Sequence, residues 1–173
     1  DCWPVALNMP RYSIVIPAYN ESARIGATLE RIGAYAIEQG WDLELLVVND
    51  GSRDQSWAIM QRLAEGDPHL VAVNLSRNHG HQLALTAGLD LCRGDSIMII
   101  DADLQDPPEL LSAMLATMRA EQADVVYGVR KSREGETAFK RATAHGFYRL
   151  LSRATEVDIT LDTGDFRLMS RRA

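Results

Sequence analysis

Short apolar segments alternate with amphipathic ones along this 173-residue chain, and this alternation is the feature that most constrains its fold. Residues 12–17 are rich in β-branched side chains and end at a proline, which is typical of a buried strand. In residues 23–39 the apolar positions recur at helical spacing, so one helical face is expected to pack on a sheet. The same reasoning predicts strands at 12–17, 43–50, 70–75, 96–101, 124–128 and 166–169, and helices at 23–39, 52–65, 81–91, from 106 onward and at 138–153.

This order of elements predicts an α/β fold, a Rossmann-like and mostly parallel sheet with helices on both faces. Local signals refine the helix ends. Residues 52–55 match a capping box that would begin the second helix, and Gly94 is expected to close the third. Residues 106–109 would begin the fourth helix, because Asp caps, Pro suits the first turn and Glu follows three residues later. In such sheets ligands bind at the carboxyl ends of the strands.

The net charge of −6 hides a split along the chain. Residues 1–129 hold 8 Lys+Arg and 18 Asp+Glu, whereas residues 130–173 hold 10 and 6, so an acidic body carries a basic C-terminal part. An acidic body argues against a nucleic-acid partner, which usually requires a basic excess. No run approaches the roughly 18 apolar residues of a membrane helix. The two cysteines fit no metal or redox spacing and predict reduced thiols in a reducing compartment.

Polar residues follow the first two predicted strands. Tyr19 and Glu21 come after the first, and Asp50 with Gly51 and Ser52 after the second. Turn and cap chemistry explains the glycine and serine fully, but it does not require Tyr19 or Asp50. A carboxylate can accept the N–H groups of a base and a tyrosine can stack on a planar ring, so a nucleobase pocket is the second interpretation.

Three oxygen-bearing side chains follow the fourth strand. If residues 101–105 are extended, Asp101, Asp103 and Gln105 project to one side and converge at the sheet edge. Hard oxygen ligands suit Mg²⁺ or Mn²⁺, which take one or two carboxylates together with substrate phosphates. The alternative, helix capping, accounts for Asp106 but leaves two adjacent carboxylates that repel each other unless a cation or protons intervene.

Any bound phosphate would have to be neutralised by a metal and by side chains, because the sequence has neither G-x-x-x-x-G-K-[ST] nor G-x-G-x-x-G. The candidates are Arg77, after the third strand, and Arg130, after the fifth, which has further basic residues beyond it. A lone arginine such as Arg77 is more often a solvated surface residue. Residues 79–81 (His-Gly-His) lack a third metal partner and are interpreted as a turn and helix start.

Four ordered segments of the chain resemble a known family. Residues 14–21 (IVIPAYNE), 48–52 (VNDGS), 101–109 (DADLQDPPE) and 162–169 (DTGDFRLM) are similar to the inverting glycosyltransferase family 2, with its GT-A fold. The greatest likeness is to its polyprenyl-phosphate branch, the dolichyl-phosphate mannose synthases and the bacterial enzymes that load glucose onto undecaprenyl phosphate. A lone D-x-D is weak, whereas four motifs in order are specific.

The resemblance implies roles for single residues. Pro17, Tyr19, Glu21 and Asp50 would hold the base and ribose of a UDP- or GDP-hexose. Asp101 and, from its position after the third strand, Arg77 complete the set expected to bind the nucleotide sugar. The divalent ion on the diphosphate, Mg²⁺ or Mn²⁺, would be held by Asp101, Asp103 and Gln105. The acceptor phosphate would meet Arg130 with Lys140 and Arg141, and Asp165 falls where the family keeps an essential acidic residue. Asp165, Asp103 and Arg130 are thus the expected catalytic residues.

The resemblance also implies a division of the chain and a setting for the enzyme. Residues 1–11 would be a tail and 12–173 a GT-A catalytic domain truncated at its C-terminus, with a donor part at 12–129 and an acceptor part at 130–173. Absent C-terminal segments would bring the enzyme to the cytoplasmic face of a membrane. The oligomeric state is left open, a homo-oligomer included. Two alternatives remain, a saccharide hydroxyl as acceptor and a non-catalytic nucleotide-sugar-binding module.

Overall fold

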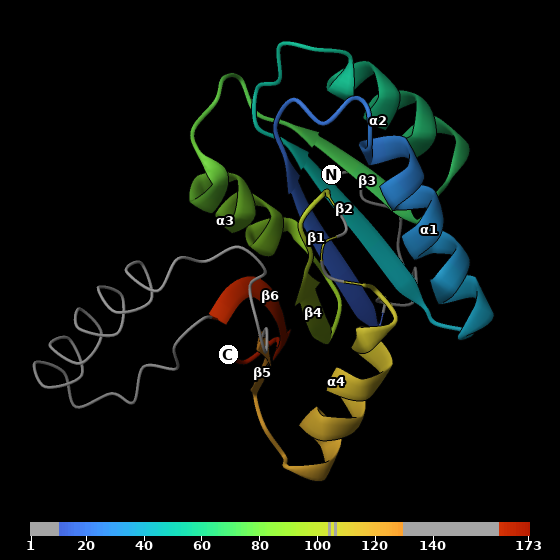
Figure 1. The fold of residues 1–173 in the computed structure, drawn as a ribbon, viewed down its shortest axis with the longest axis vertical. Coiled ribbons are helices and arrows are strands. Elements are labelled where there is room, and N and C mark those ends of the chain that lie inside the picture. Colours follow the sequence, from blue (N-terminus) through green and yellow to red (C-terminus); the bar gives the residue numbers. More distant parts are fainter. Residues whose placement is uncertain (1–10, 104, 106, 130–162) are drawn as a thin grey trace, which may run out of the picture. The chain divides into compact units, whose positions relative to one another are not determined.

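The computed structural model describes residues 11–103, 105, 107–129 and 163–173 of the chain. In this part strands and helices alternate as the sequence predicts, and most bounds agree within a few residues (Figure 1). The strands are β1 (Tyr12–Ala18), β2 (Leu43–Asn49), β3 (Leu70–Asn74), β4 (Ser96–Ile99), β5 (Val125–Val129) and β6 (Thr163–Ser170). The helices are α1 (Ile25–Glu38), α2 (Ser56–Gly66), α3 (His81–Leu91) and α4 (Leu110–Ala120). The basic helix predicted at 138–153 lies outside the described residues.

The strands form one six-stranded sheet in the order β3-β2-β1-β4-β6-β5. β1 pairs in parallel with β2 and β4, and β2 with β3, so the carboxyl ends of these four strands lie at the same edge. β6 pairs with β4 in the antiparallel sense. The mostly parallel α/β sheet predicted from the alternation is therefore confirmed.

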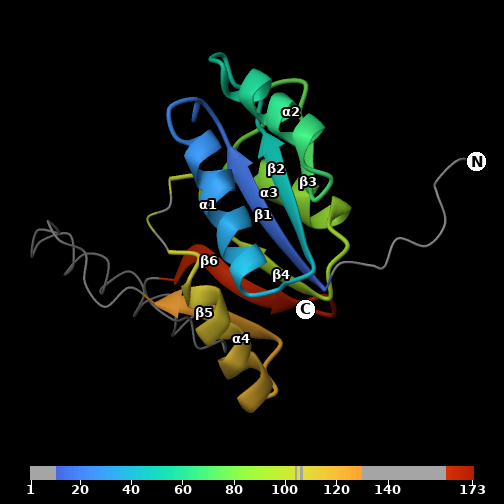
Figure 2. The same ribbon diagram turned by 90° about the vertical axis from the view of Figure 1, so that its right-hand side faces the viewer.

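Side chains of alternate residues in the central strands enter two separate cores, as the period of a strand requires. One core joins the even positions of β1 to α1, α2 and α4, and Ile14 and Ile32 are both almost fully buried in it. The other core joins Val15, Leu46 and Ile99 to Leu85 of α3. Helices thus cover both faces of the sheet, with α3 on the face opposite α1 and α2 (Figure 2).

The capping box predicted at residues 52–55 is wrong. α2 begins at Ser56, and Gln55 makes no side-chain capping bond. Asp54 takes the capping role instead, since its Oδ1 accepts the N–H of Ser56 at 2.9 Å. The hydroxyl of Ser52 faces another loop, where it accepts the N–H of Asn20 at 2.9 Å.

Gly94 does not close α3 as predicted. The helix ends at Leu91, and its C-cap residue Cys92 is extended. Gly94 packs against the start of β1, where a Cβ atom would collide with the backbone of Tyr12 and Ser13. The glycine is needed for close approach of two backbone segments, not for a left-handed helix end.

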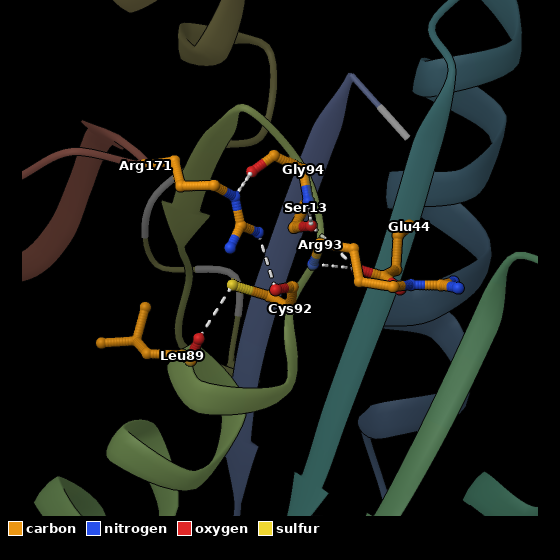
Figure 3. A network of polar contacts seen from close by, with 7 residues as sticks. All are labelled: Ser13, Glu44, Leu89, Cys92, Arg93, Gly94 and Arg171. Atoms are coloured by element: carbon orange, nitrogen blue, oxygen red, sulfur yellow. Dashed lines mark hydrogen bonds and ion pairs between the residues drawn. The ribbon is translucent and has the colours of Figure 1, made fainter. Parts of the chain in front are cut away.

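A buried polar network lies at the amino ends of β1 and β2 (Figure 3). Glu44 is 3% exposed, and its carboxylate accepts hydrogen bonds from three donors. These are the hydroxyl of Ser13 at 2.8 Å, the backbone N–H of Arg93 at 2.9 Å and Nε of Arg93 at 2.7 Å. Ser13 Oγ in turn accepts the N–H of Gly94 at 2.7 Å. A buried carboxylate surrounded by donors in this way fastens the loop before β4 to the sheet.

The same network continues into the last residues of the chain. Arg171 donates from Nε to the carbonyl of Gly94 at 2.9 Å and from a terminal nitrogen to the carbonyl of Cys92 at 2.7 Å. The Cys92 thiol donates to the carbonyl of Leu89 at 3.1 Å, and burial raises its pKa. These contacts hold the end of β6 against the loop that precedes β4, beside the strand with which β6 pairs.

The chain divides into two compact units, Asp1–Val126 with Asp165–Ala173, and Tyr127–Gly164. The first contains the parallel strands and the four helices that the structure describes. Of the second the structure describes residues 127–129 and 163–164. Among the described residues no helix combines the length and apolar character needed to cross a membrane.

Candidate functional site

A cavity of about 400 Å³ opens at the carboxyl ends of β1, β2 and β4. Its lining joins the ends of these three strands to the start of α3, and consists of Pro17, Ala18, Tyr19, Glu21, Asp50, Asn78, His81, Ala84, Asp101, Ala102 and Asp103. Four of these side chains are carboxylates, and neither Lys nor Arg occurs among these lining residues. The cavity is therefore lined by acidic side chains and by one exposed aromatic ring, that of Tyr19.

The loop after β1 is held in shape by the segment that precedes α2. Asn20 adopts a positive φ of 57°, and its Oδ1 accepts the N–H of Arg53 at 2.9 Å. The N–H of Glu21 donates to Ser56 Oγ at 2.8 Å, and that of Ser22 to Asp54 Oδ2 at 3.1 Å. Because the backbone of residues 20–22 is bound in this way, the Glu21 side chain is presented to the cavity from a fixed loop.

The Asp54 carboxylate joins the loop after β1 to the segment that precedes α2. Desolvation would raise the pKa of its carboxyl group, but hydrogen bonds from Ser56 and Ser22 outweigh this effect and hold the pKa well below its ordinary value. The group is therefore a carboxylate at neutral pH, and as an acceptor of charge-assisted bonds it joins the start of α2 to the loop at the cavity edge.

The end of β2 fixes the segment between β3 and α3. Asp50 is 2% exposed, and its two oxygens accept the N–H groups of His79 at 2.7 Å and Gly80 at 2.9 Å. Gly51 has a φ of +65°, and a Cβ atom there would collide with the backbone of Arg77. The Asp-Gly pair thus sets the position of residues 77–80 and, through them, the first turn of α3.

The residues after β4 meet α3 at the cavity. Asp101 Oδ1 lies 4.0 Å from Nε2 of His81, the first residue of that helix, and each of these side chains is 42% exposed. Ala102 and Asp103 form a turn, so the extended conformation that we assumed for residues 101–105 is wrong. Asp103 Oδ1 accepts the N–H of Gln105 at 3.1 Å, and the Gln105 residue is exposed.

The chemistry of this site fits a divalent ion that takes only part of its ligands from the protein. Asp101 and Asp103 both line the cavity, and two carboxylates completed by phosphate oxygens and water are a common magnesium arrangement. Within the described residues no group of three or more His, Cys, Asp or Glu side chains is placed to hold a metal alone.

The structure brings together most of the residues proposed for the donor side. Those that line the cavity are Pro17, Tyr19, Glu21, Asp50, Asp101 and Asp103. Arg77 and Gln105 are exposed and are absent from that lining. Arg130, Lys140 and Arg141 lie outside the described residues. Asp165 lies in β6, and the structure describes its backbone position without its side chain.

Sequence reasoning missed the contribution of the segment after β3. Asn78, His81 and Ala84 line the cavity, although we interpreted residues 79–81 only as a turn and helix start. That interpretation holds for the backbone, since Gly80 is the N-cap and α3 begins at His81. The strand topology indicates these residues, because β3 is parallel to β2 and the chain therefore leaves β3 at the same edge of the sheet.

Comparison with known proteins assigns the chain to a family. Residues 13–173 match the model described as "Glycosyl transferase family 2". An uncharacterized glycosyltransferase of Bacillus subtilis, YkcC, is 50% identical over 162 residues, which are 94% of this chain and 50% of that protein. The prophage bactoprenol glucosyl transferase homolog of Escherichia coli is 37% identical, over 93% of this chain and 52% of its own length. The chain thus spans about half the length of these relatives.

Solved structures show the same fold. A mannosyltransferase of Pyrobaculum calidifontis, in complex with GDP-Man and Mn²⁺, matches with a TM-score of 0.66 and 24% identity, over 99% of this chain and 48% of that one. Glucosyl-3-phosphoglycerate synthase of Mycobacterium tuberculosis, in complex with UDP, matches with a TM-score of 0.68 and 21% identity, over 94% and 57%. At these identities the likeness shows the fold alone, and the expected GT-A architecture is confirmed.

Proposed function

The chain belongs to glycosyl transferase family 2, and we propose that its cavity binds the donor for an inverting, metal-dependent transfer of a hexose to a polyprenyl phosphate. One observation carries the proposal, namely that the Asp101 and Asp103 carboxylates share one cavity with Tyr19 and Glu21. A nucleotide sugar has a planar base and an anionic diphosphate. The cavity offers an aromatic ring for the base and a pair of metal-binding carboxylates for the diphosphate.

On the nucleotide side, Tyr19 would stack on the base, and Glu21 would accept N–H groups or ribose hydroxyls. The Tyr19 residue is 39% exposed, so its ring can be covered by a ligand. Asp50 already accepts two backbone N–H groups, and its main contribution would be to hold the loop that walls the cavity. These contacts suit both UDP- and GDP-hexoses, which we propose as the donor class.

On the diphosphate side, Asp101 and Asp103 would hold Mg²⁺ or Mn²⁺ against the two phosphates, with Gln105 as the third expected ligand. A bound divalent ion would stabilise the charge that develops on the leaving diphosphate. His81 lies beside this pair, since its Nε2 is 4.0 Å from Asp101 Oδ1. The turn at Ala102 and Asp103 is itself fixed from α1, where Thr28 donates its hydroxyl to the carbonyl of Ala102 at 2.7 Å.

The acceptor would be a polyprenyl phosphate, as the name of the bactoprenol relatives suggests. Its phosphate is already ionised at neutral pH, so the reaction needs little help from a base. A phosphate oxygen attacks the anomeric carbon, the bond from this carbon to the diphosphate oxygen breaks, and the nucleoside diphosphate leaves with the bonding electrons, which inverts the carbon. Arg130, Lys140 and Arg141 would offset the repulsion between the two anions. Asp165 would orient one of the substrates.

The setting of the reaction follows from its acceptor. A polyprenyl phosphate resides in a membrane and a nucleotide sugar in the cytoplasm, so we place the enzyme at the cytoplasmic face of a membrane. The remaining half of the length of the relatives would supply the attachment. The division between a donor part at 12–129 and an acceptor part at 130–173 belongs to the same proposal.

The experiment combines the full-length protein with Mn²⁺, radiolabelled UDP- and GDP-hexoses and a short polyprenyl phosphate, and separates the labelled lipid by extraction. We expect a glycolipid with one donor, and none when Mn²⁺ is removed by a chelator. An Asp103→Asn variant should lose this activity. Its matched control is Asp90→Asn, a substitution of an exposed residue of α3 that is absent from the cavity lining.

Two results would overturn parts of the proposal. Absence of glycolipid with every donor would reject the lipid acceptor, and transfer to an oligosaccharide under the same conditions would establish a hydroxyl acceptor instead. An Asp103→Asn variant that keeps full transfer activity would reject the metal-binding role of the cavity.

A further inference from the structure

Arg167 of β6 is a cationic side chain with an unusual environment. Its Nε atom is buried and has no hydrogen-bond partner among the described residues. Elsewhere in the described part of the chain the arginines near the core are paired, as Arg93 is with Glu44 and Arg171 with backbone carbonyls. A buried donor without a partner costs stability, so its retention requires an explanation.

The strand register places Arg167 on the face of the sheet that α3 covers. Arg167 pairs with Ile99 of β4, and directly opposite residues of an antiparallel pair project to the same side. Ile99 is part of the core that includes Leu85 of α3, and Met169, two residues beyond Arg167, packs against that core as well. Arg167 therefore shares its face with α3 rather than with α1 and α4.

The same register places Arg167 at the cavity end of β4. Its partner Ile99 is the last residue of that strand, and Asp101 of the cavity lining follows two residues later. His81, at the cavity end of α3, lies 4.0 Å from Asp101, so this carboxylate also meets the α3 side. The backbone of Arg167 is thus beside the strand that Asp101 and Asp103 follow, and an arginine side chain is long enough to extend along it.

The negative charge of the cavity favours a nearby cation such as the Arg167 guanidinium group. Four carboxylates line the cavity, and a diphosphate would add further negative charge. One divalent ion neutralises only two charges, and the lining residues include no Lys or Arg, so a second cation would have to reach the diphosphate from beside the cavity. A guanidinium group can bind phosphate oxygens through two parallel N–H donors, and such binding would satisfy the Nε donor of Arg167, which has no partner among the described residues.

We infer that Arg167 binds the diphosphate of the nucleotide substrate beside Asp101, an inference that rests on the proposed donor site. In this role Nε of Arg167, which has no partner among the described residues, would donate a hydrogen bond to the anion. The stability that this unsatisfied donor costs without ligand would be regained when the anion binds. Arg167 would thus complete the diphosphate site from β6, the strand inserted in antiparallel sense beside β4 (Figure 1).

The test measures binding of UDP and GDP to the full-length protein by titration calorimetry in the presence of Mn²⁺. For the nucleotide that binds, Arg167→Gln should weaken affinity by about 10- to 100-fold, the usual effect of losing a hydrogen-bonded charged group. Arg167→Lys should recover part of the loss, because it restores the charge without the two parallel donors. The matched control is Arg172→Gln, an exposed arginine of the same segment that pairs with Asp124 and should bind within about twofold of the parent.

A second readout separates diphosphate binding from a structural role. Without nucleotide, the thermal midpoint of Arg167→Met should equal or exceed that of the parent, because a buried donor without a partner is removed. A clear fall in the midpoint would make Arg167 a structural residue and overturn the inference. Parent-like affinity of Arg167→Gln for the nucleotide would also overturn it and leave the donor site intact. If the parent bound neither UDP nor GDP, the proposed function would itself fail.

Discussion

At the amino end of the sheet Glu44 is buried and accepts three hydrogen bonds from Ser13 and Arg93, whereas at the carboxyl end Asp101 and Asp103 line an open cavity. Both regions bring carboxylates to the ends of neighbouring parallel strands. At one end the protein supplies the donors itself, and the charge fastens a loop. At the other the carboxylates are presented to solvent, where a bound cation can stabilise them.

The difference shows how one fold separates stability from function. The amino-end carboxylate is surrounded by donors from β1 and from the loop before β4, which a ligand could not replace. Asp101 and Asp103 are close in sequence at the cavity, and a bound cation would reduce the repulsion between their carboxylates. Mutations at the two ends should therefore affect different measurements.

The largest effect is expected at the cavity. Asp103→Asn keeps the size of the side chain but removes its charge, so kcat/KM for hexose transfer should fall by about 10²- to 10³-fold, as for other groups that stabilise a transition-state charge. The free energy of unfolding should change by less than about 0.5 kcal/mol, because the side chain lies at an open cavity. Activity assays and urea titrations on the same preparations measure both quantities. Comparable losses in stability and activity would show that the two ends do not differ.

The opposite pattern is expected for Glu44→Gln. The amide nitrogen would face the N–H donors of Arg93 or the hydroxyl of Ser13, and a partly buried ion pair would be broken from one side. Unfolding should become easier by about 2–4 kcal/mol in urea titrations, whereas nucleotide affinity of the folded protein should stay within about twofold. Glu38→Gln, on an exposed position near the end of α1, is the matched control. A loss of nucleotide affinity in folded Glu44→Gln would contradict the separation.

Substitution of two glycines, one near each end of the sheet, tests the same comparison through the backbone. Gly51→Ala would press a methyl group against the backbone of Arg77 and Asn78 beside the cavity, and Gly94→Ala would press one against Ser13 at the other end. Each should cost about 1–3 kcal/mol of stability, since native packing leaves no room. Gly51→Ala alone should also weaken nucleotide binding, because it displaces the loop that carries Asn78 into the cavity. Equal nucleotide affinities of the two folded variants would show that this loop does not shape the site.

The parallel part of the fold and much of the cavity could be predicted from the sequence. In a parallel sheet every strand ends at the same edge, so positions after the apolar runs become neighbours without knowledge of the strand order. This rule predicts that Tyr19, Asp50 and Asp101 lie together, and all three line the cavity.

Contacts that depend on strand order or on the course of a loop could not be predicted. β6 is inserted between β4 and β5, so nothing in its pattern indicated that Arg167 would pair with Ile99. The turn at Ala102 depends on the hydroxyl of Thr28, which is 74 residues away in the sequence. The capping prediction at residues 52–55 failed for a similar reason, because Ser52 bonds to a distant loop rather than to its own helix.

The smallest effect is expected at Asp54, which belongs to the cavity end but has the structural role of Glu44. Its pKa is lowered in the folded protein, so its carboxylate contributes stability that is fully present above the unfolded pKa of about 4 and is lost as pH falls below it. Asp54→Asn should therefore cost about 1–2 kcal/mol at pH 7 and progressively less below about pH 4. Urea titrations of both proteins from pH 7 to pH 3 measure the difference. A difference that stayed constant with pH would assign the stabilisation to the shape of the side chain rather than to its charge, and Asp54 would then differ in kind from Glu44.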